Sequence, residues 1–198
     1  MYPKKLQKII DWFSSFPGLG ARSAERIALY ILNMPIEKVR KFSNELIEMK
    51  KSIRRCEICG NYAQETLCEI CRDNERNREI LCIVEEAKDI FSLEKGTRIK
   101  PLYHVLGGKL SPVNGITPED LNLKNISERI TKEKIKEVII ATSSDMEGEA
   151  TAQYIFETIK NQPVKITRIG FGIPYGTSFE LANPATIEKS FENRIPLA

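Results

Sequence analysis

The chain lacks the features of membrane and secreted proteins. Its longest run without a charged residue, Ile169–Phe179, spans only eleven residues and contains Gly and Pro. A membrane-spanning helix needs about 20 apolar residues, so none is expected. Asp11 and the Pro17–Gly18 pair interrupt the segment where a signal peptide would carry its apolar core. We therefore expect a soluble, cytoplasmic protein with no membrane partner.

Histidine is scarce, and internal repeats and low-complexity segments are absent. The single histidine, His104, has no evident partner nucleophile, so we expect it to pack or hydrogen-bond beside its strand. The 198 residues are 41% hydrophobic and 29% charged, which is the composition of a folded chain. This length suits one domain, or two or three small ones.

Positive charge is concentrated near the N-terminus. Residues 1–55 hold twelve Lys and Arg against five Asp and Glu, whereas residues 56–198 hold eighteen against twenty-two. A basic segment joined to an acidic remainder suggests that the basic part meets a polyanion. Solvated, lysine-rich helix faces would give the same pattern, and charge alone does not decide between the two.

Four of the five cysteines form two C-x-x-C pairs separated by eight residues, namely Cys56, Cys59, Cys68 and Cys71. Two such pairs supply four thiolates to one tetrahedral centre, which suits Zn²⁺, and four protein ligands make the site structural. A redox pair or an iron–sulfur ligand set are the alternatives, although a redox C-x-x-C usually occurs once. The fifth, Cys82, lies in an apolar run and is expected in the core.

Helical periodicity dominates the basic segment. Apolar residues recur at helical spacing on both sides of an interruption at residues 16–20, Phe-Pro-Gly-Leu-Gly. A third helix is predicted to start near Pro35, because proline suits the first turn of a helix. Its apolar residues are expected to face inward, and they are Ile36, Val39, Phe42, Leu46 and Ile53.

After the cysteines, predicted strands alternate with predicted helices. The strands cover residues 80–84, 102–106, 137–141 and 164–169, and the helices cover 86–93, 123–130 and 149–159. Residues 107–118 are rich in Gly, Pro, Ser and Asn and are predicted as a loop. This order implies a mainly parallel sheet covered by helices.

The interruption in the basic segment could hold phosphate. Gly18 and Gly20 allow positive φ and close backbone approach, and the next helix begins directly after them. Arg22 and Arg26 lie on one face of that helix. This arrangement resembles the helix-hairpin-helix motif, which contacts the DNA backbone without reading bases. A tight helix–helix turn with two surface arginines is the alternative, but the glycine spacing and the basic charge favour nucleic acid. Neighbouring lysines would assist, namely Lys4, Lys5 and Lys8.

Acidic residues follow two of the predicted strands. Glu85 and Asp89 come after the first strand, and Glu147 and Glu149 come after the third. Sites in parallel sheets form at the carboxyl ends of strands, where such acids could share one Mg²⁺. Acids are also favoured at helix N-termini by the helix dipole, and this reading remains open.

The ordered combination of motifs resembles the RecR family of bacterial recombination mediators along nearly the whole chain. The motifs are Phe16–Gly20, the four cysteines, Leu102–Gly108, Ser111–Ile116, Ile140–Thr142 and Glu147–Ala152. The resemblance implies an α+β protein of several modules. These are a helix-hairpin-helix head (1–54), a four-cysteine zinc finger (55–78), a Toprim domain (79–170) and a C-terminal arm (171–198) for oligomerisation.

The resemblance also implies a function without catalysis. Members of the family form ring-like tetramers that can encircle DNA, and they act with RecO and RecF to load recombinase at single-stranded gaps. The positions that match their DNA-contacting residues are Arg22 and Arg26. The Toprim acids match Glu85, Asp89, Glu147 and Glu149, and in the family these positions are associated with binding of partners, especially RecO.

Some residues depart from the related patterns. Glu147 and Glu149 stand where Toprim enzymes carry Asp-x-Asp, and Asp145 is an additional acid. Tyr154 lies inside a predicted helix and cannot be assigned as a nucleophile. Asn183 stands where an Asp is common, which leaves a nucleotide-related role of the arm open.

Two other functions remain as alternatives. The first is a Mg²⁺-dependent, Toprim-type enzyme acting on DNA phosphodiesters through Glu85, Glu147 and Glu149. The second is a zinc-stabilised adaptor that does not contact DNA itself.

Overall fold

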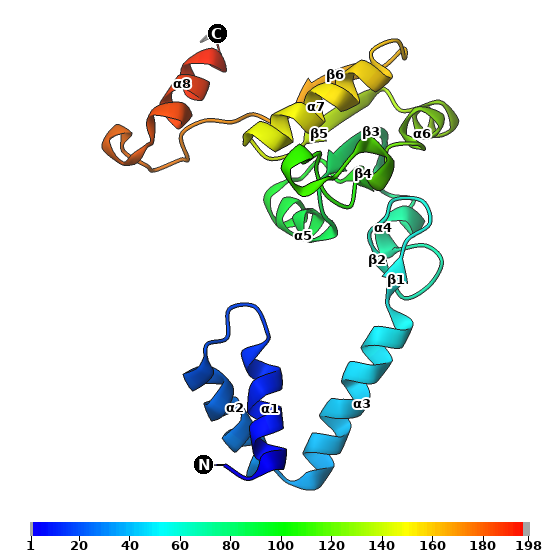
Figure 1. Cartoon of the computed structure of the whole chain (residues 1–198). Coiled ribbons are helices and arrows are strands. Elements are labelled where there is room, and N and C mark those ends of the chain that lie inside the picture. Colours follow the sequence, from blue (N-terminus) through cyan, green and yellow to red (C-terminus); the bar gives the residue numbers. More distant parts are fainter. Residues whose placement is uncertain (1, 196–198) are drawn as a thin grey trace. The chain divides into compact units, whose positions relative to one another are not determined.

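The computed structural model describes residues 2–195 of the chain (Figure 1). The chain divides into two compact units, Met1–Ile53 and Arg54–Ala198. The first residue of the predicted head and residues 196–198 of the predicted arm lie outside the described residues. Among the helices within residues 2–195, none is both long and apolar enough to pass through a lipid bilayer.

The first unit contains, in its described part, the helices α1 (Lys4–Ser14), α2 (Ala21–Leu32) and α3 (Ile36–Ser52). A small core joins α1 to α2, and it consists of Ile10, Ala24 and Ala28 with Leu6 and Phe13 packed against it. The two alanines allow the helix backbones to approach closely. Pro35 occupies the N-cap of α3, so the predicted start of the third helix is confirmed.

The predicted inward orientation of the α3 apolar residues is wrong for the single chain. No residue of α3 is buried. Phe42 is 47% exposed and Leu46 is 46% exposed, Ile36 and Ile53 are also exposed, and Val39 is half-buried. Periodicity identifies residues that share one face of a helix, but it does not identify what covers that face. The core between α1 and α2 leaves this face of α3 uncovered.

The second unit is built on a four-stranded parallel sheet, as predicted. Its strands are β3 (Asn77–Val84), β4 (Pro101–Val105), β5 (Glu137–Ala141) and β6 (Lys165–Arg168). They lie in the order β4-β3-β5-β6, and each neighbouring pair is parallel. The carboxyl ends of all four strands therefore emerge at the same edge of the sheet.

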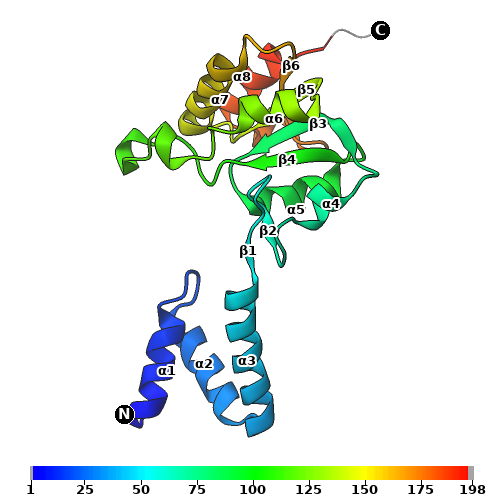
Figure 2. The same ribbon diagram turned by 90° about the vertical axis from the view of Figure 1, so that its right-hand side faces the viewer.

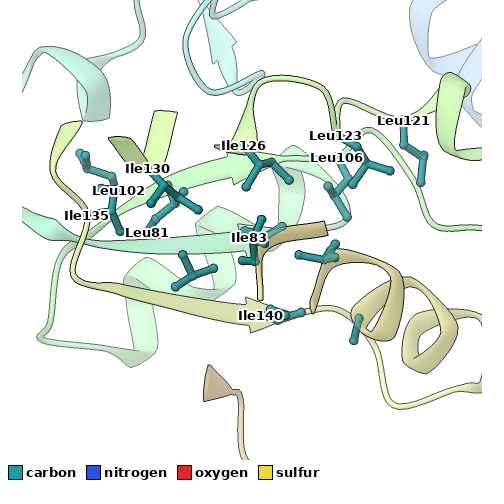
Figure 3. Packing of buried hydrophobic residues seen from close by; sticks show 14 residues of the cluster. Leu81, Ile83, Leu102, Leu106, Leu121, Leu123, Ile126, Ile130, Ile135 and Ile140 are labelled. Atoms are coloured by element: carbon teal, nitrogen blue, oxygen red, sulfur yellow. The ribbon is translucent and has the colours of Figure 1, made fainter. Parts of the chain in front are cut away.

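Helices cover both faces of this sheet (Figure 2). Helix α5 (Ala87–Gly96) packs with Cys82 and Val84 on one face, and Cys82 is in the core as expected. The other face carries α6 (Ile126–Glu133) and α7 (Met146–Ile159), which pack against the alternate residues of β3 (Figure 3). Sheets buried on both faces consist of nearly continuous apolar strands, which explains the run at residues 80–84.

Several short elements escape prediction because they are too short to show periodicity. They are the hairpin of β1 (Arg54–Arg55) and β2 (Tyr62–Ala63), helix α4 (Glu69–Arg72), and the 3-10 helices Pro112–Asn114, Pro118–Asp120 and Phe179–Leu181. Sequence reasoning also missed α8 (Pro184–Glu192). Asn183 caps this helix by accepting a hydrogen bond from the Thr186 amide at 2.8 Å.

The single histidine hydrogen-bonds beside its strand, as expected. His104 in β4 is completely buried, and its Nε2 lies 2.6 Å from the carbonyl oxygen of Asn122. This contact requires Nε2 to carry the proton, since a carbonyl only accepts. Burial, aided by the nearby charge of Arg129, lowers the pKa of His104 to about 4. The imidazole is therefore neutral at pH 7.

The low pKa of His104 predicts a loss of stability on mild acidification. An unfolded histidine titrates near pH 6.5, so between pH 6.5 and pH 4 the unfolded chain binds a proton that the native chain excludes. The free energy of unfolding should fall by about 2 kcal/mol from this residue between pH 7 and pH 5. Urea titrations at both pH values on the zinc-loaded wild type and on His104→Gln would isolate the contribution. Equal pH dependence in the two proteins would contradict it.

Candidate functional site

The turn between α1 and α2 depends on one glycine in the left-handed region. Gly18 has φ of +80°, whereas Gly20 has φ of −79° and ψ of 165° and serves as the N-cap of α2. Positive φ is thus found at Gly18 but not at Gly20. A Cβ added to Gly20 would meet nothing within 4 Å, so the chain itself does not require glycine there. The exposed backbone at this position remains open to close approach by a ligand.

The N-terminus of α2 presents unsatisfied donors. Within the described residues, the amides of Ala21 and Arg22 have no acceptor, while those of Ser23 and Ala24 bond to the Gly20 carbonyl at 3.0 Å. No acidic residue occupies the first turn of this twelve-residue helix. Free amides and the positive end of the helix dipole together favour an anion at this turn.

Two arginines extend this positive end along one face of α2. Arg22 and Arg26 are exposed, and neither forms an ion pair or side-chain hydrogen bond with any residue in the range 2–195. Glu25 lies next to Arg26 in sequence, but its carboxylate accepts a hydrogen bond from the Tyr2 hydroxyl. Both guanidinium groups are therefore available to a phosphate that approaches the turn.

The predicted lysines do not gather at the turn. Lys4, Lys5 and Lys8 lie on the first two turns of α1, at the end of the helix that is remote from Gly18. Lys8 precedes the last residue of α1 by six positions, which corresponds to about 9 Å along the axis. All three are exposed. They enlarge the positive surface of the first unit rather than contribute to the turn itself.

The four cysteines of the C-x-x-C pairs converge in the second unit. All four are buried, and their sulfur atoms lie within 4.8 Å of one another. The Sγ atoms of Cys59 and Cys68 are 3.5 Å apart. A tetrahedral zinc site with bonds of about 2.3 Å places its sulfurs about 3.8 Å apart. The cluster therefore fits a structural Zn²⁺, and the convergence of four sulfurs is more than a redox pair requires.

The cysteine cluster is attached to the edge of the sheet. The Val105 amide at the end of β4 donates a hydrogen bond to the Cys59 carbonyl at 2.8 Å. Gly60 has φ of +76°, and a Cβ on it would lie 3.2 Å from the Val105 carbonyl oxygen. Glycine is thus required both by its conformation and by the close approach. Since β4 is an edge strand, the metal loop also covers part of an otherwise open edge.

The predicted acids lie near the carboxyl edge, but each has a separate partner. Glu85 accepts hydrogen bonds from the amide and the hydroxyl of Ser143 at 2.7 and 2.8 Å. Asp89 caps α5 by accepting from the Glu86 amide at 2.7 Å. Asp89 therefore has the helix-capping role that the sequence left open as an alternative.

The acids that follow β5 are bound by basic and hydroxyl groups. Ser111 donates to Glu147, whose other carboxylate oxygen lies 3.5 Å from Lys109 Nζ. Glu149 pairs with Arg168 at 3.1 Å. Among groups of three or more Asp, Glu, His or Cys side chains within residues 2–195, only the four cysteines have ligand atoms that lie close enough together to share one metal ion. The structure thus does not bring Glu85, Glu147 and Glu149 together as one preformed ligand set.

Sequence reasoning missed two basic residues, Arg168 and Lys109, at the carboxyl edge of the sheet. Arg168 donates to the Thr142 hydroxyl at 2.6 Å and to the Ser143 carbonyl at 2.9 Å, so it fixes the loop that contacts Glu85. Lys109 contacts the acids from the loop after β4. The sequence offers no local signal for these contacts, because the partners lie nineteen or more positions apart.

The cysteine geometry predicts one tightly bound zinc ion per chain. Cys59→Ser with Cys68→Ser should abolish zinc binding and lower the free energy of unfolding by several kcal/mol, because zinc binding supplies folding energy to such a small segment. Metal analysis and thermal melting would measure both effects. Hydrogen exchange at the Val105 amide should accelerate, because its acceptor belongs to the metal loop.

Cys82→Ala is the matched control for this experiment, because it removes a buried thiol outside the cluster. This variant should keep one zinc per chain. Wild-type zinc content in the Cys59→Ser, Cys68→Ser variant would refute the assignment of the ligands.

Comparisons with known protein families agree with this geometry. Residues 6–50 match a family model described as RecR, helix-hairpin-helix, and residues 53–73 match the model of the RecR four-cysteine zinc finger domain. Residues 79–170 match a Toprim domain. The three matches follow one another along the chain and cover nearly all of its three N-terminal helices, its cysteine cluster and nearly all of its parallel sheet. The protein therefore belongs to the RecR family of recombination-repair proteins, with a structural four-cysteine zinc site and a Toprim domain.

Proposed function

We propose that this RecR protein is a non-enzymatic, DNA-binding mediator of recombinational repair. It acts in the cytoplasm with RecO and RecF to load recombinase at single-stranded gaps. Its four parts are the head (1–54), the zinc finger (55–78), the Toprim domain (79–170) and the arm (171–198). Family membership supports the repair function, and the features of the head support direct DNA contact.

The observation that carries this proposal is the unpaired positive end of α2. Two free amides and the Arg22 side chain lie in the first turn of α2, and Arg26 lies one turn further along the same face. Neither arginine has a partner in residues 2–195, and no acidic residue occupies the first turn of the helix. Such donors suit phosphate oxygens, and nothing in the turn presents a base-reading pattern. Binding should therefore be independent of sequence and should weaken steeply as salt rises. Gly18 and Gly20 shape the turn, and Lys4, Lys5 and Lys8 add long-range attraction.

Assembly into a tetrameric ring would explain three further features. One head offers few phosphate contacts, so several heads on one DNA would raise affinity through effective concentration. The exposed apolar residues of α3 need a cover that the single chain does not supply. The arm likewise exposes large apolar side chains, including Tyr175, Phe179 and Leu181. We propose that contacts between copies cover these surfaces.

The acidic edge of the Toprim domain is the proposed surface for RecO. Glu85, Asp89, Glu147 and Glu149 lie at or near the ends of β3 and β5, and their internal partners hold most of them in fixed positions. The side chain of Glu147 is 33% exposed and that of Glu149 is 44% exposed, so a basic partner can still reach them. Complementary charge would speed association and define orientation.

The head assignment predicts a large loss of DNA affinity in an Arg22→Ala, Arg26→Ala variant. At about 0.1 M salt the dissociation constant should rise roughly 10- to 100-fold, because two charge-assisted phosphate contacts per chain are lost. The slope of log K against log salt should fall by about one for each contact removed. Fluorescence anisotropy with gapped DNA across a salt series would measure both quantities.

An Arg40→Ala, Lys41→Ala variant is the matched control, because it removes the same charge from exposed residues of α3 that already pair with Glu37 and Glu45. Its affinity should stay within a few-fold of the wild type. Full affinity in the Arg22→Ala, Arg26→Ala variant would refute the head assignment. Failure of the wild type to bind DNA at low salt would favour an adaptor without DNA contact.

The match to a Toprim domain keeps one enzymatic alternative, a Mg²⁺-dependent activity on DNA phosphodiesters. We expect no nicking, relaxation or synthesis when the pure protein is incubated with supercoiled DNA and Mg²⁺, because the acids already have internal partners. Gel electrophoresis of the plasmid provides the measurement. Activity that disappears in Glu147→Gln would establish the enzyme and overturn the mediator without catalysis.

A further inference from the structure

The loop after β4 passes the carboxyl ends of the strands, where the acidic residues Glu85, Asp145 and Glu147 lie. Two hydrogen bonds from its backbone amides hold this loop in place. Gly107, with φ of +90°, donates its amide to the Glu85 carbonyl at the end of β3 at 2.9 Å. Leu110 donates its amide to the Thr151 hydroxyl on α7 at 2.9 Å. Lys109 lies between these two attachments. Its position at the edge is therefore set by backbone contacts and not only by its own side chain.

The ammonium group of Lys109 contacts two acids. It pairs with Asp145 and lies 3.5 Å from Glu147 Oε2. Ser111, on the same loop, donates its hydroxyl to the other oxygen of Glu147. The loop thus supplies both a cation and a hydroxyl to the acids that follow β5.

The pKa of Lys109 agrees with these two contacts. The pKa of Lys109 is raised, chiefly by its hydrogen bond to Asp145 and also by the charges of Asp145, Glu85 and Glu147. Glu85 follows β3, whereas Asp145 and Glu147 follow β5. By direct contact, Lys109 compensates the two carboxylates that follow β5, which is the electrostatic role of a divalent ion at such an edge.

The burial of Lys109 is unusual for a lysine. Its side chain is only 27% exposed, less than either of the acids that it contacts. Lysine is ordinarily among the most exposed residues unless it is paired. Lys88, by contrast, pairs with a single acid, Glu86, and remains 71% exposed. Lys109 is thus held among the acids, whereas Lys88 is an ordinary surface pair.

We propose that Lys109 is a tethered cation that takes the place of a divalent ion between Asp145 and Glu147. The acidic edge then keeps its arrangement without Mg²⁺. A protein that docks on this edge meets carboxylates whose positions do not depend on the supply of metal. This inference goes beyond the proposed function and does not require DNA or partner binding.

Removal of the Lys109 charge provides the test. In Lys109→Met the carboxylates of Asp145 and Glu147 lose their shared cation, so a divalent ion should bind there at least tenfold more tightly than to the wild type. Mn²⁺ is a suitable probe, because it prefers the same oxygen ligands as Mg²⁺ and its free form is measured by electron paramagnetic resonance. The zinc-loaded full chain is used in buffer without chelators, since a chelator would remove the structural zinc.

Two variants separate charge from other effects. Lys109→Arg keeps the charge and should bind Mn²⁺ as weakly as the wild type. Lys136→Met removes the same charge from an exposed pair with Glu79, before the amino end of β5, and should also match the wild type. In melting experiments, Mg²⁺ should raise the midpoint of Lys109→Met more than that of the other three proteins. Lys109→Gln gives a second neutral variant if Lys109→Met does not fold.

Three results would overturn the proposal. The first is equal Mn²⁺ affinity in the wild type and both neutral variants. The second is tight binding in Lys109→Arg, which would show that side-chain shape rather than charge is responsible. The third is the same gain in Lys136→Met, which would indicate a general effect of net charge. None of these outcomes depends on DNA binding, so they are distinguishable from failure of the proposed function.

Discussion

The parallel direction of the four strands is the constraint on which the second unit depends. Helices bury both faces of the sheet, so polar groups from the chain can gather only at its edges and ends. Since all carboxyl ends emerge together, the residues after β3, β4 and β5 necessarily become neighbours. Acids from two of these positions would repel one another without compensation. Lys109 and Arg168 provide that compensation from within the chain.

The same sheet also explains the placement of the zinc site. A segment with two-residue strands and a four-residue helix buries too little apolar surface to be stable alone. Four thiolates on one metal ion supply the missing free energy, and Ile70 packs against both the cysteines and the core beneath α5. The bond from Val105 to Cys59 then joins the metal loop to β4. Metal binding and the order of this sheet edge are therefore linked.

Charge has a different role in each unit. In the first unit, the arginines of α2 have no acidic partner among residues 2–195, so their charge is directed to solvent and to ligands. In the second unit, most charges at the strand ends are paired and thereby fixed in position. An unpaired cation attracts a mobile polyanion, whereas a paired acid offers a defined but weaker contact. The proposed function uses this contrast, with DNA contact assigned to the head and protein contact to the Toprim domain.

The sequence by itself determined the features that rest on local spacing. The C-x-x-C pairs defined the metal ligands. The apolar run at 80–84 and the three later predicted strands, alternating with helices, defined a parallel sheet. Pro35 marked the start of a helix. Only the tertiary structure decided which groups face one another. It left the apolar face of α3 uncovered, assigned Asp89 to a helix cap, and brought Lys109 to Asp145 across 36 positions of sequence. Spacing fixes the direction of neighbouring side chains through backbone geometry, whereas contacts between distant residues depend on how the packed elements bring them together.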